Sequence, residues 1–499
     1  MPRRRPLDLA PGLPTERLDA PVVEVPADAR AALADVVGDA LTSDDAALVD
    51  AARDWWPLSA VWATQGRVAR RPAVVVTPAD TDQVAGVLRV ASTHGIPVTP
   101  AAGRSGVGGG AVPVCGGIVV DLTRLDAGPE IDETSLRVTV GPGVFGDVLE
   151  SRLRSRGYTL GHWPQSIDIS TVGGWLACRG AGQFSTRYGK IEDMVAGLEV
   201  VLASGETLRT GGAPRSAVGP DLDQVFVGSE GALGVITEAT LRVHAAPASE
   251  EREAWTLPTF EAGLETCRRI LRRGATPAVL RLYDEHETRQ TYDVDGCVLL
   301  ALDEGDPALV LATMAVAAEE TREIEGSQPA DVGLVEQWMG HRNDVSALGR
   351  AIEADVVVDT VEVAGTWSDL PAVYAQVTEA VRAVEGTVAV SAHCSHSYID
   401  GGCLYFTLAG MVGDDPAAKD AYYAAAFNGA VEAARVAGAA ISHHHGVGIN
   451  RAPFVRDALG PVAFDTLAGI KNALDPRGIL NPGALGLPSP FLPDGWTWE

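Results

Sequence analysis

The sequence has few lysines and no surplus of basic charge. Its only lysines are Lys190, Lys419 and Lys471, and 39 lysines and arginines stand against 66 aspartates and glutamates, for a formal net charge of −27. General nucleic-acid binding requires a basic surface, which this composition does not offer. We therefore expect no nucleic-acid partner, whereas a local arginine pocket for an anionic substrate stays compatible with the charge.

Cysteine pairs and long apolar runs are also absent. The six cysteines are scattered without any Cys-x-x-Cys pair, which argues against a zinc ribbon and a disulfide framework, so we expect reduced thiols in a cytoplasmic protein. No run of about 18 apolar residues occurs, and no apolar stretch of signal-peptide length follows the basic N-terminus. We expect no membrane span, and we leave open a peripheral membrane contact and a homodimer.

The 499 residues suggest two to four domains. We predict an N-terminal helical region (1–67), an α+β domain (68–247), a second α+β domain (248–440) and a C-terminal segment (441–499). Apolar runs predict strands at 72–78, 96–103, 116–122, 135–143, 278–284, 296–303 and 404–413, and a hairpin at 198–210. Helical periodicity predicts helices at 43–63, 79–95, 145–157, 260–274 and 467–485.

A glycine-dense segment, "AAGRSGVGGGAVPVCGGIVVDL", resembles a dinucleotide-binding turn only superficially. Gly106-x-Gly108-x-x-Ala111 fits the formal pattern, and Glu130 lies about 20 residues further on. That turn must open a helix, whose N-terminus holds the diphosphate, yet here a proline, two glycines and a predicted strand follow. The segment is therefore not a Rossmann turn.

Glycine-rich segments recur, at 141–143, 173–174 and 228–234. A flexible turn explains one such segment, but four in one domain indicate close backbone approach to a large ligand. Glycines let backbone N–H groups form an anion-binding nest without a helix. A diphosphate-bearing ligand fits this pattern.

"PAAGRSGVGGG", "PQSIDISTVGGWLACRGAGQFSTRYGKIEDMVAGLEVVL" and "GSEGALGVITEA" together resemble the FAD domain of the vanillyl-alcohol oxidase flavoprotein superfamily over residues 70–245. Within it, "GHWPQSIDISTVGGW", "LRLYD", "YIDGGCLYF" and "SHHHGVG" are similar to the alkyldihydroxyacetonephosphate synthase family from about residue 54 to 485. The resemblance implies an α+β fold: a two-subdomain FAD-binding domain, then an α+β cap domain for substrate, with the C-terminal segment returning to the FAD domain.

The same resemblance implies which residues surround FAD. The diphosphate would lie against Pro100, Ala101, Ala102, Gly103, Arg104, Ser105 and Gly106. The rest of FAD would lie against Gln165, Ser166, Ile167, Asp168, Ile169, Ser170, Thr171, Cys178, Arg179, Gly180, Ala181, Glu230, Gly231, Ala232, Leu233, Gly234, Val235 and Ile236. Some relatives tether FAD through a histidine in the first glycine loop. Val107 and its neighbours offer no such nucleophile, so we expect noncovalent FAD.

Three consecutive histidines, His443, His444 and His445, precede a glycine-rich turn. Neighbouring residues point in different directions, so a single ion rarely takes all three, although His393 and His396 offer a second segment for a metal site. FAD-dependent 2-hydroxyacid dehydrogenases, which the chain also resembles, carry two histidines and a glutamate as metal ligands. Tyr398, Tyr405 and His444 stand at those positions here, and phenols are poor ligands at neutral pH. We therefore expect no metal.

The synthase resemblance implies instead that Tyr405 is an acid–base residue and that His443, His444 and His445 are required for activity. An imidazole beside a phenol eases proton transfer. Arg281 matches an arginine important in that family. A substrate-binding arginine is expected between Gly340 and Arg350, where Arg350 and Arg342 compete; either suits a phosphate.

Three functions follow. The first is exchange of the acyl chain of acyl-dihydroxyacetone phosphate, a small lipid-like substrate, for a fatty alcohol without net redox change. The second is FAD-dependent oxidation of a 2-hydroxyacid or another hydroxylated substrate. The third, more remote, is a flavin-binding protein that is not an enzyme. All three require FAD, so only the chemistry of the substrate pocket separates them.

Overall fold

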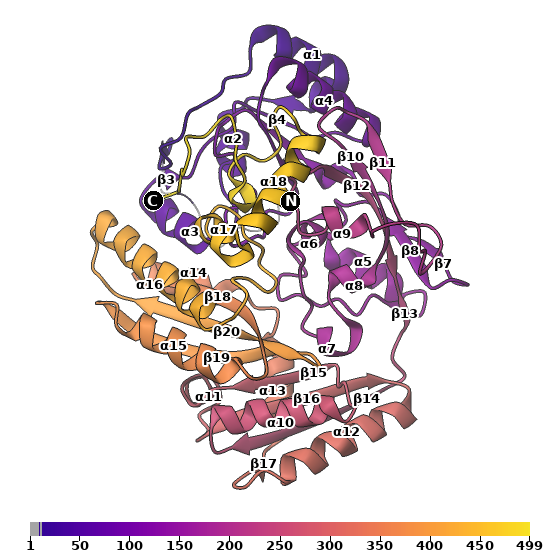
Figure 1. Ribbon diagram of the computed structural model, residues 1–499, viewed down its shortest axis with the longest axis vertical. Helices are drawn as coiled ribbons and strands as arrows, with labels where there is room; N and C mark the ends of the chain where they lie inside the picture. The colour runs from indigo at the N-terminus through magenta and orange to yellow at the C-terminus, as the bar shows by residue number, and fades with distance from the viewer. Residues whose placement is uncertain (1–8, 10–11) are drawn as a thin grey trace.

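The computed structural model describes residue 9 and residues 12–499. Figure 1 shows two lobes: the N-terminal half of the chain forms the upper one, a large sheet with its helices forms the lower one, and the C-terminal segment lies back against the upper lobe. Within the described residues, no helix combines the length and the apolarity that crossing a membrane requires.

The upper lobe contains two sheets. A four-stranded sheet has the order β2 (Leu41–Thr42), β4 (Val74–Val76), β6 (Ile118–Asp121) and β5 (Val98–Ala101), with β4, β6 and β5 parallel. A five-stranded antiparallel sheet has the order β11 (Thr207–Arg209), β10 (Val195–Val201), β12 (Val235–Arg242), β8 (Arg137–Val140) and β7 (Glu130–Asp132). Short strands pair as β1 (Thr15–Glu16) with β3 (Arg67–Val68), and β9 (Tyr158–Thr159) with β13 (His244–Ala245).

Helices of the upper lobe follow from capping and apolar spacing. In α4 (Thr81–His94), Asp80 accepts a hydrogen bond from the backbone N–H of Gln83, and Gly95 ends the helix in the left-handed conformation. The other helices are α1 (Ala27–Val37), α2 (Asp45–Ala51), α3 (Pro57–Thr64), α5 (Gly146–Arg154), α6 (Val172–Cys178), α7 (Ser185–Tyr188), α8 (Ile191–Met194) and α9 (Asp223–Phe226). The single helix predicted at 43–63 is divided, because a residue before proline, here Trp56, avoids helical backbone angles.

The lower lobe is one seven-stranded sheet. Its order is β17 (Gln328–Pro329), β14 (Ser249–Leu257), β16 (Cys297–Gly305), β15 (Val279–Tyr283), β19 (Thr387–Ser397), β20 (Gly401–Gly410) and β18 (Val357–Thr366). Its helices are α10 (Phe260–Arg272), α11 (Glu285–Tyr292), α12 (Pro307–Arg322), α13 (Gly333–His341), α14 (Ser346–Glu353), α15 (Leu370–Arg382) and α16 (Pro416–Val436).

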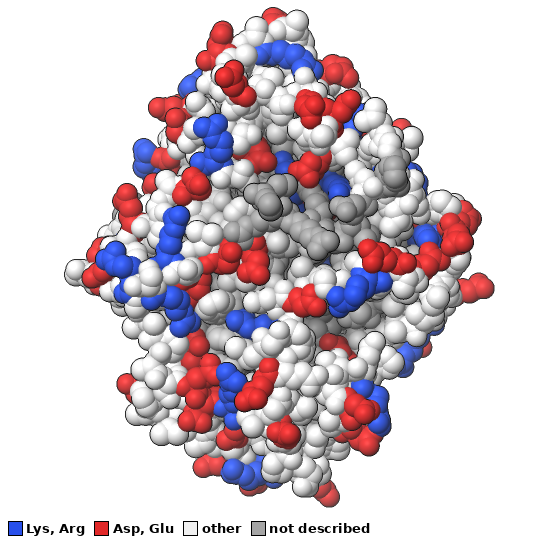
Figure 2. All heavy atoms as spheres, turned by 180° about the vertical axis from the view of Figure 1, so that it is seen from behind, with Lys and Arg blue, Asp and Glu red and all other residues white. Residues whose placement is uncertain are grey.

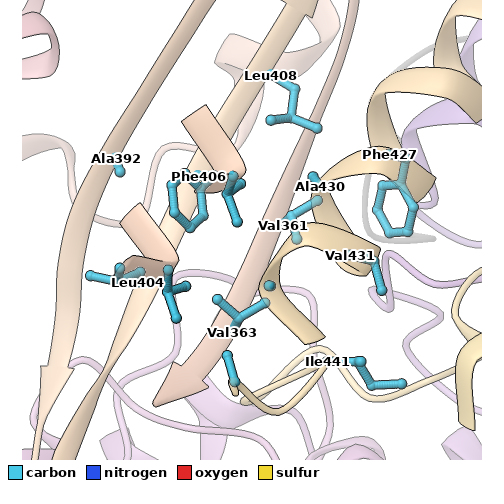
Figure 3. Packing of buried hydrophobic residues seen from close by; sticks show 14 of the residues in the cluster. Val361, Val363, Ala392, Leu404, Phe406, Leu408, Phe427, Ala430, Val431 and Ile441 are labelled. Atoms are coloured by element: carbon cyan, nitrogen blue, oxygen red, sulfur yellow. The ribbon is translucent and has the colours of Figure 1, made fainter. Parts of the chain in front are cut away.

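Alternation along β18 and β20 separates two faces of this sheet. Apolar side chains of both strands pack against α16 in a buried cluster (Figure 3), which includes Val361, Val363, Leu404, Phe406, Phe427, Ala430, Val431 and Ile441. Successive side chains of a strand point to opposite faces, so Glu362 and Tyr405 point away from α16. The face opposite the helices therefore carries the polar residues. Ile441 anchors the chain just before the histidine triplet.

The C-terminal segment closes the upper lobe. After α17 (Val455–Leu459) and α18 (Pro461–Leu474), the chain lies along β5: the N–H of Val98 donates to Ile479 O (2.8 Å), and the N–H of Asn481 donates to Val98 O (2.8 Å). This return to the first domain was expected. The glycine-dense turn runs into β6, a strand parallel to β5, so the exclusion of a Rossmann turn is confirmed.

On the face drawn in Figure 2, the described acidic and basic side chains are interspersed and form no extended basic surface. All six cysteines are free thiols, and all but Cys178 are buried. Trp56 is buried and donates through Nε1 to the Tyr423 hydroxyl (2.8 Å), so it belongs to the core.

Candidate active site

Two of the glycine-rich segments, 100–108 and 228–234, meet two further loops, 165–171 and 446–450. Gly103 lies so close to Ile169 O that a Cβ there would overlap that carbonyl, and Gly231 is in similar contact with Pro100. A Cβ on Gly448 would overlap the backbone of Gly108. These contacts bring segments 100–108, 165–171, 228–234 and 446–450 together, as expected for residues that enclose one large ligand.

The first loop offers an anion-binding backbone. The N–H groups of residues 103–108 donate no hydrogen bond to any other described residue, so they are available as a nest for a diphosphate. Arg104 itself is committed to carboxylates, since its guanidinium contacts Asp50 (3.2 Å) and Asp121 (2.8 Å). We therefore expect the backbone of this loop, more than the Arg104 side chain, to hold the phosphates.

The wall of this region contains an unsatisfied imidazole. His162 is buried just before the 165–171 loop, and neither of its ring nitrogens has a hydrogen-bond partner among the described residues. Burial lowers the pKa of His162 to about 3, so the ring is neutral. Orphaned buried nitrogens beside a glycine cradle fit a polar cofactor such as FAD.

The remaining residues expected around FAD divide into two groups. Thr171 caps α6 through its hydroxyl, and Ser170 accepts a hydrogen bond from Trp175 Nε1 (2.7 Å), so both shape the loop that precedes Cys178–Ala181. Val235 and Ile236 lie in β12, where their side chains belong to hydrophobic clusters.

The histidine triplet curls around a buried carboxylate. Glu362, with an exposure of 0%, accepts hydrogen bonds from the backbone N–H groups of residues 443, 444 and 445 (3.2, 3.2 and 2.8 Å) and from the Ser442 hydroxyl (2.6 Å). Its other oxygen pairs with Arg451. Although burial opposes its ionisation, Arg451 and His445 hold the pKa of Glu362 well below its usual range. An anion therefore fixes this loop.

Because the loop curls, the rings of His443 and His444 meet, contrary to the expectation that neighbouring histidines point in different directions. His443 Nε2 lies 3.0 Å from the Tyr398 hydroxyl, and its Nδ1 lies 2.9 Å from Nδ1 of His444. The His444 ring stacks on Tyr405 with 6.0 Å between centroids, and His445 meets Tyr405 edge-on at 5.6 Å. Burial lowers the pKa of both His443 and His444 well below the ordinary value, so both rings are neutral at physiological pH.

Tyr405 lies in a row of polar side chains that crosses four strands. Its cross-strand neighbours are Glu362 on β18 and His393 on β19, and His393 pairs in turn with Tyr283 on β15. The Tyr405 and His393 rings are nearly parallel, with centroids 4.9 Å apart. Tyr405 is therefore held between two imidazoles, His393 and His444. Burial raises the pKa of its phenol well above the ordinary value, so the hydroxyl keeps its proton.

Arg281 extends this row. Its Nη2 lies 2.6 Å from His393 Nε2, and its Nε donates to the Tyr283 hydroxyl (2.6 Å). His393 in turn contacts Glu287 through Nδ1 (2.8 Å). Burial and Arg281 lower the pKa of His393, so a neutral imidazole separates the guanidinium from the carboxylate. A cation is thereby positioned beside Tyr405.

The two competing arginines, Arg342 and Arg350, lie differently in the lower lobe, which is the predicted cap domain and is called the cap lobe below. Arg342 lies over the rings of Trp163 and Phe184 (5.2 Å each) and of Trp338 (5.9 Å), and it makes no salt bridge to a described carboxylate. Arg281 lies over the same Trp338 ring at 5.8 Å. Arg350 is 64% exposed and pairs with Asp344 at the surface. Arg342 lines a cavity of about 420 Å³ and shares the Trp338 ring with Arg281, whereas Arg350 lies at the surface.

Several residues of this site escaped the sequence analysis: Glu362, Glu287, Trp338, Ser185 and Lys190. Lys190 Nζ donates to the carbonyl of His443 (2.6 Å), and Ser185 of α7 contacts both His396 and Tyr398. Glu362 left a signal, an acidic residue in the apolar run 357–364. The others come from distant segments that no local pattern connects.

Comparison with known proteins agrees with this arrangement. An FAD binding domain profile matches residues 72–211, and the profile of the C-terminal domain of FAD linked oxidases matches residues 246–485. An uncharacterized FAD-linked oxidoreductase, YgcU, of Escherichia coli (strain K12) is 35% identical over 431 residues, which cover 83% of this chain and 89% of the relative.

Two further matches concern one enzyme. The alkyldihydroxyacetonephosphate synthase of Trypanosoma brucei brucei is 29% identical over 480 residues, which cover 88% of this chain and 76% of the relative. A solved structure of an alkyldihydroxyacetonephosphate synthase superposes with a TM-score of 0.77 at 23% identity, covering 95% of this chain and 90% of that one. The fold expected from the sequence, of the vanillyl-alcohol oxidase type, is confirmed.

Proposed function

This chain belongs to the FAD-linked oxidase family, and on that premise we propose that it exchanges the acyl group of acyl-dihydroxyacetone phosphate for a fatty alcohol. The observation that carries the proposal is Tyr405, a protonated phenol held between His393 and His444 beside a cation. This is an acid–base site.

FAD is the cofactor, and the residues present fit it: the nest at 103–108, the 165–171 loop, the 178–181 segment and the 230–234 turn would hold it. When bound, FAD supplies an isoalloxazine ring that accepts electron density from a substrate carbon. The loop from His443 to Gly448 lies against the first glycine loop and Glu230, so the histidines reach the cofactor region from the opposite side.

In the exchange, Tyr405 takes the proton from the substrate carbon C1 and later returns it. The phenol is protonated at rest, so it accepts that proton only while passing its own to neutral His444, directly or through one substrate oxygen. The bond between C1 and the acyl oxygen breaks, and the carboxylate leaves with the electron pair. The alcohol loses its proton, and its oxygen bonds to C1; one proton is released overall.

Two arginines suit the charges of such a substrate. Arg342 sits against three aromatic rings and makes no salt bridge to a described carboxylate, although its Nη1 donates to Gln183 (3.4 Å) and Glu250 and Glu304 line the same cavity. Its guanidinium suits an incoming phosphate. Arg281 contacts the same Trp338 ring and lies beside Tyr405 and His393, where it can stabilise the leaving carboxylate. The proposed substrate therefore spans the distance between Arg342 and Tyr405.

The test is steady-state turnover of Tyr405→Phe, His444→Ala and the double variant. Loss of an acid–base group lowers turnover about 10²- to 10⁴-fold, and the double variant should be barely slower than either single one because the two act together. Tyr422→Phe is the matched control, since Tyr422 is a buried tyrosine of α16 whose hydroxyl hydrogen-bonds Thr387 of β19 (3.2 Å), away from the proposed site. If Tyr405→Phe retains full FAD and near wild-type turnover, the acid–base role is wrong.

A second candidate is net oxidation of a 2-hydroxyacid or another hydroxylated substrate. It is favoured by the 35% identical relative, whose name is that of an FAD-linked oxidoreductase. Anaerobic mixing separates the two. A hydroxylated substrate that is oxidised bleaches the flavin spectrum permanently, whereas exchange incorporates labelled fatty alcohol and leaves the oxidised spectrum in place.

A further inference from the structure

Three imidazoles meet beside Tyr405. His396, His443 and His444 each offer one ring nitrogen within 4.8 Å of the other two, and their ring centroids are 5.0–5.2 Å apart. His396 comes from β19, and the other two come from the triplet loop. Ligands from two separate segments are what metal sites commonly use.

The backbone explains why His396 faces this point. Strict alternation would turn His396 away from the face that carries His393. A bulge between Cys394 and His396 shifts the register, so that His396 pairs with Cys403, which lies on the same face as Tyr405. His393, the other histidine of this segment, lies on the far side of Tyr405 and is not part of the cluster.

Hydrogen bonds prepare two of the rings as ligands. His396 Nδ1 lies 2.7 Å from the Ser185 hydroxyl, and His443 Nε2 lies 3.0 Å from the Tyr398 hydroxyl. If these nitrogens carry the protons, Nε2 of His396 and Nδ1 of His443 keep lone pairs for a ligand. His443 Nδ1 and His444 Nδ1 are already 2.9 Å apart.

We propose that His396, His443 and His444 bind one zinc-like divalent ion, and that this ion inhibits the enzyme by withdrawing His444 from proton transfer. Three neutral imidazoles with an open fourth position suit zinc. Lys190, which donates to the carbonyl of His443 (2.6 Å), places positive charge beside the site and weakens binding. The ion is thus a reversible inhibitor. Catalysis requires no metal.

Binding is measured first, independently of turnover. Holoenzyme dialysed against a chelator is titrated calorimetrically with zinc chloride, and we expect one ion per chain. His396→Gln should weaken zinc binding at least about tenfold, since even the loss of a hydrogen-bonded neighbour costs 10- to 100-fold. His286→Gln, an exposed histidine of α11, is the control and should bind as wild type. Absent zinc binding, or equal affinity in His396→Gln, overturns the site.

A second variant guards against misfolding of His396→Gln, which flavin content and circular dichroism monitor. Tyr398→Phe keeps the ring and removes the partner of His443, so we expect zinc to bind about 10- to 100-fold more weakly. If zinc binds Tyr398→Phe as tightly as wild type, the arrangement proposed for His443 is wrong.

Inhibition rests on the proposed role of His444, so it is measured separately. Chelation should leave wild-type turnover unchanged, and added zinc should lower it with the affinity found by calorimetry. His396→Gln should need at least about tenfold more zinc for the same fractional loss. Zinc that binds without slowing turnover overturns the inhibitory role. Zinc binding that persists while Tyr405→Phe stays active would overturn the acid–base mechanism alone.

Discussion

One loop contacts two carboxylates, the buried Glu362 and the half-buried Glu230, whose pKa values are shifted in opposite directions. Its histidine half (442–445) surrounds Glu362 of the cap lobe, and its glycine half (446–448) donates two backbone N–H groups to Glu230 of the FAD lobe, at 2.5 Å from Val447 and 2.9 Å from Gly448. Burial raises the pKa of Glu230 to about 7, whereas the pKa of Glu362 lies well below its usual range.

A directly paired cation explains why the two pKa values are shifted in opposite directions. Both carboxylates accept backbone hydrogen bonds, but only Glu362 pairs directly with a guanidinium, that of Arg451, itself 1% exposed. Backbone N–H groups alone do not offset the desolvation of a carboxylate, and a buried arginine does. The histidine half is therefore fixed at every physiological pH, while the glycine half, next to the FAD region, depends on protonation.

The largest expected effect comes from removing the charge of Glu362, the carboxylate that the histidine half surrounds. Glu362→Gln leaves Arg451 buried without its counter-ion, which should cost about 3–5 kcal/mol of unfolding free energy. The first unfolding transition in urea, monitored by the release of flavin, measures this free energy. Glu379→Gln, on the exposed face of α15, should change stability by less than about 0.5 kcal/mol. If Glu362→Gln unfolds at the wild-type urea concentration, Arg451 does not distinguish the two halves.

A smaller, pH-dependent effect is expected in the glycine half. The folded-state pKa of Glu230, about 7, exceeds its ordinary 4.5. The folded protein thus binds the extra proton, and this contribution to stability is complete below about pH 4.5 and is lost as pH rises through about 7. The pKa of Glu362 is lowered instead, so the stability that this carboxylate contributes is lost only in acid.

Glu230→Gln should remove that dependence. Between about pH 5 and 8, wild type should lose roughly 1–3 kcal/mol relative to the variant, because a pKa unit corresponds to about 1.4 kcal/mol. Unfolding of both proteins across this pH series measures the difference. Parallel pH profiles for wild type and Glu230→Gln would show that Glu230 does not titrate in this range.

We expect no covalent bond between FAD and the protein. Val107 and its neighbours offer no nucleophile for a covalent bond. Precipitation with acid should therefore leave yellow flavin in the supernatant. Flavin that stays with the protein pellet would mean that another side chain tethers it.

Local patterns predicted the elements of the fold well. The helix α4, the hairpin of β10 and β11, and the strands β4, β5 and β6 follow from short-range rules, and all are confirmed. Pro57 divided a predicted helix, which its effect on Trp56 explains. The meeting of the His443 and His444 rings did not follow from the sequence, because it depends on how the loop curls around Glu362.

The partners of the site were harder to predict. Arg342 follows α13 and lies against Trp163 and Phe184 of the other lobe, whereas Arg350 lies on α14, which packs against α3 and β18, and no local pattern predicts this difference. Glu362 becomes important only because β18 pairs with β20. The face of the sheet on which His396 lies depends on a β-bulge, which no pattern in the sequence indicated. Long-range pairing, not local propensity, decides such positions.

The return of the C-terminal segment to β5 has a consequence for how the chain is made. Val98 bonds to Ile479 and Asn481, and the Asn481 amide also donates to the carbonyls of Gly110 (2.9 Å) and Glu230 (2.7 Å). During synthesis, the first lobe leaves the ribosome long before these residues exist. It must wait, with one sheet edge uncovered, until the cap lobe has been translated. The β5 edge and the carbonyls of Gly110 and Glu230 therefore acquire these partners only in the final moments of biosynthesis.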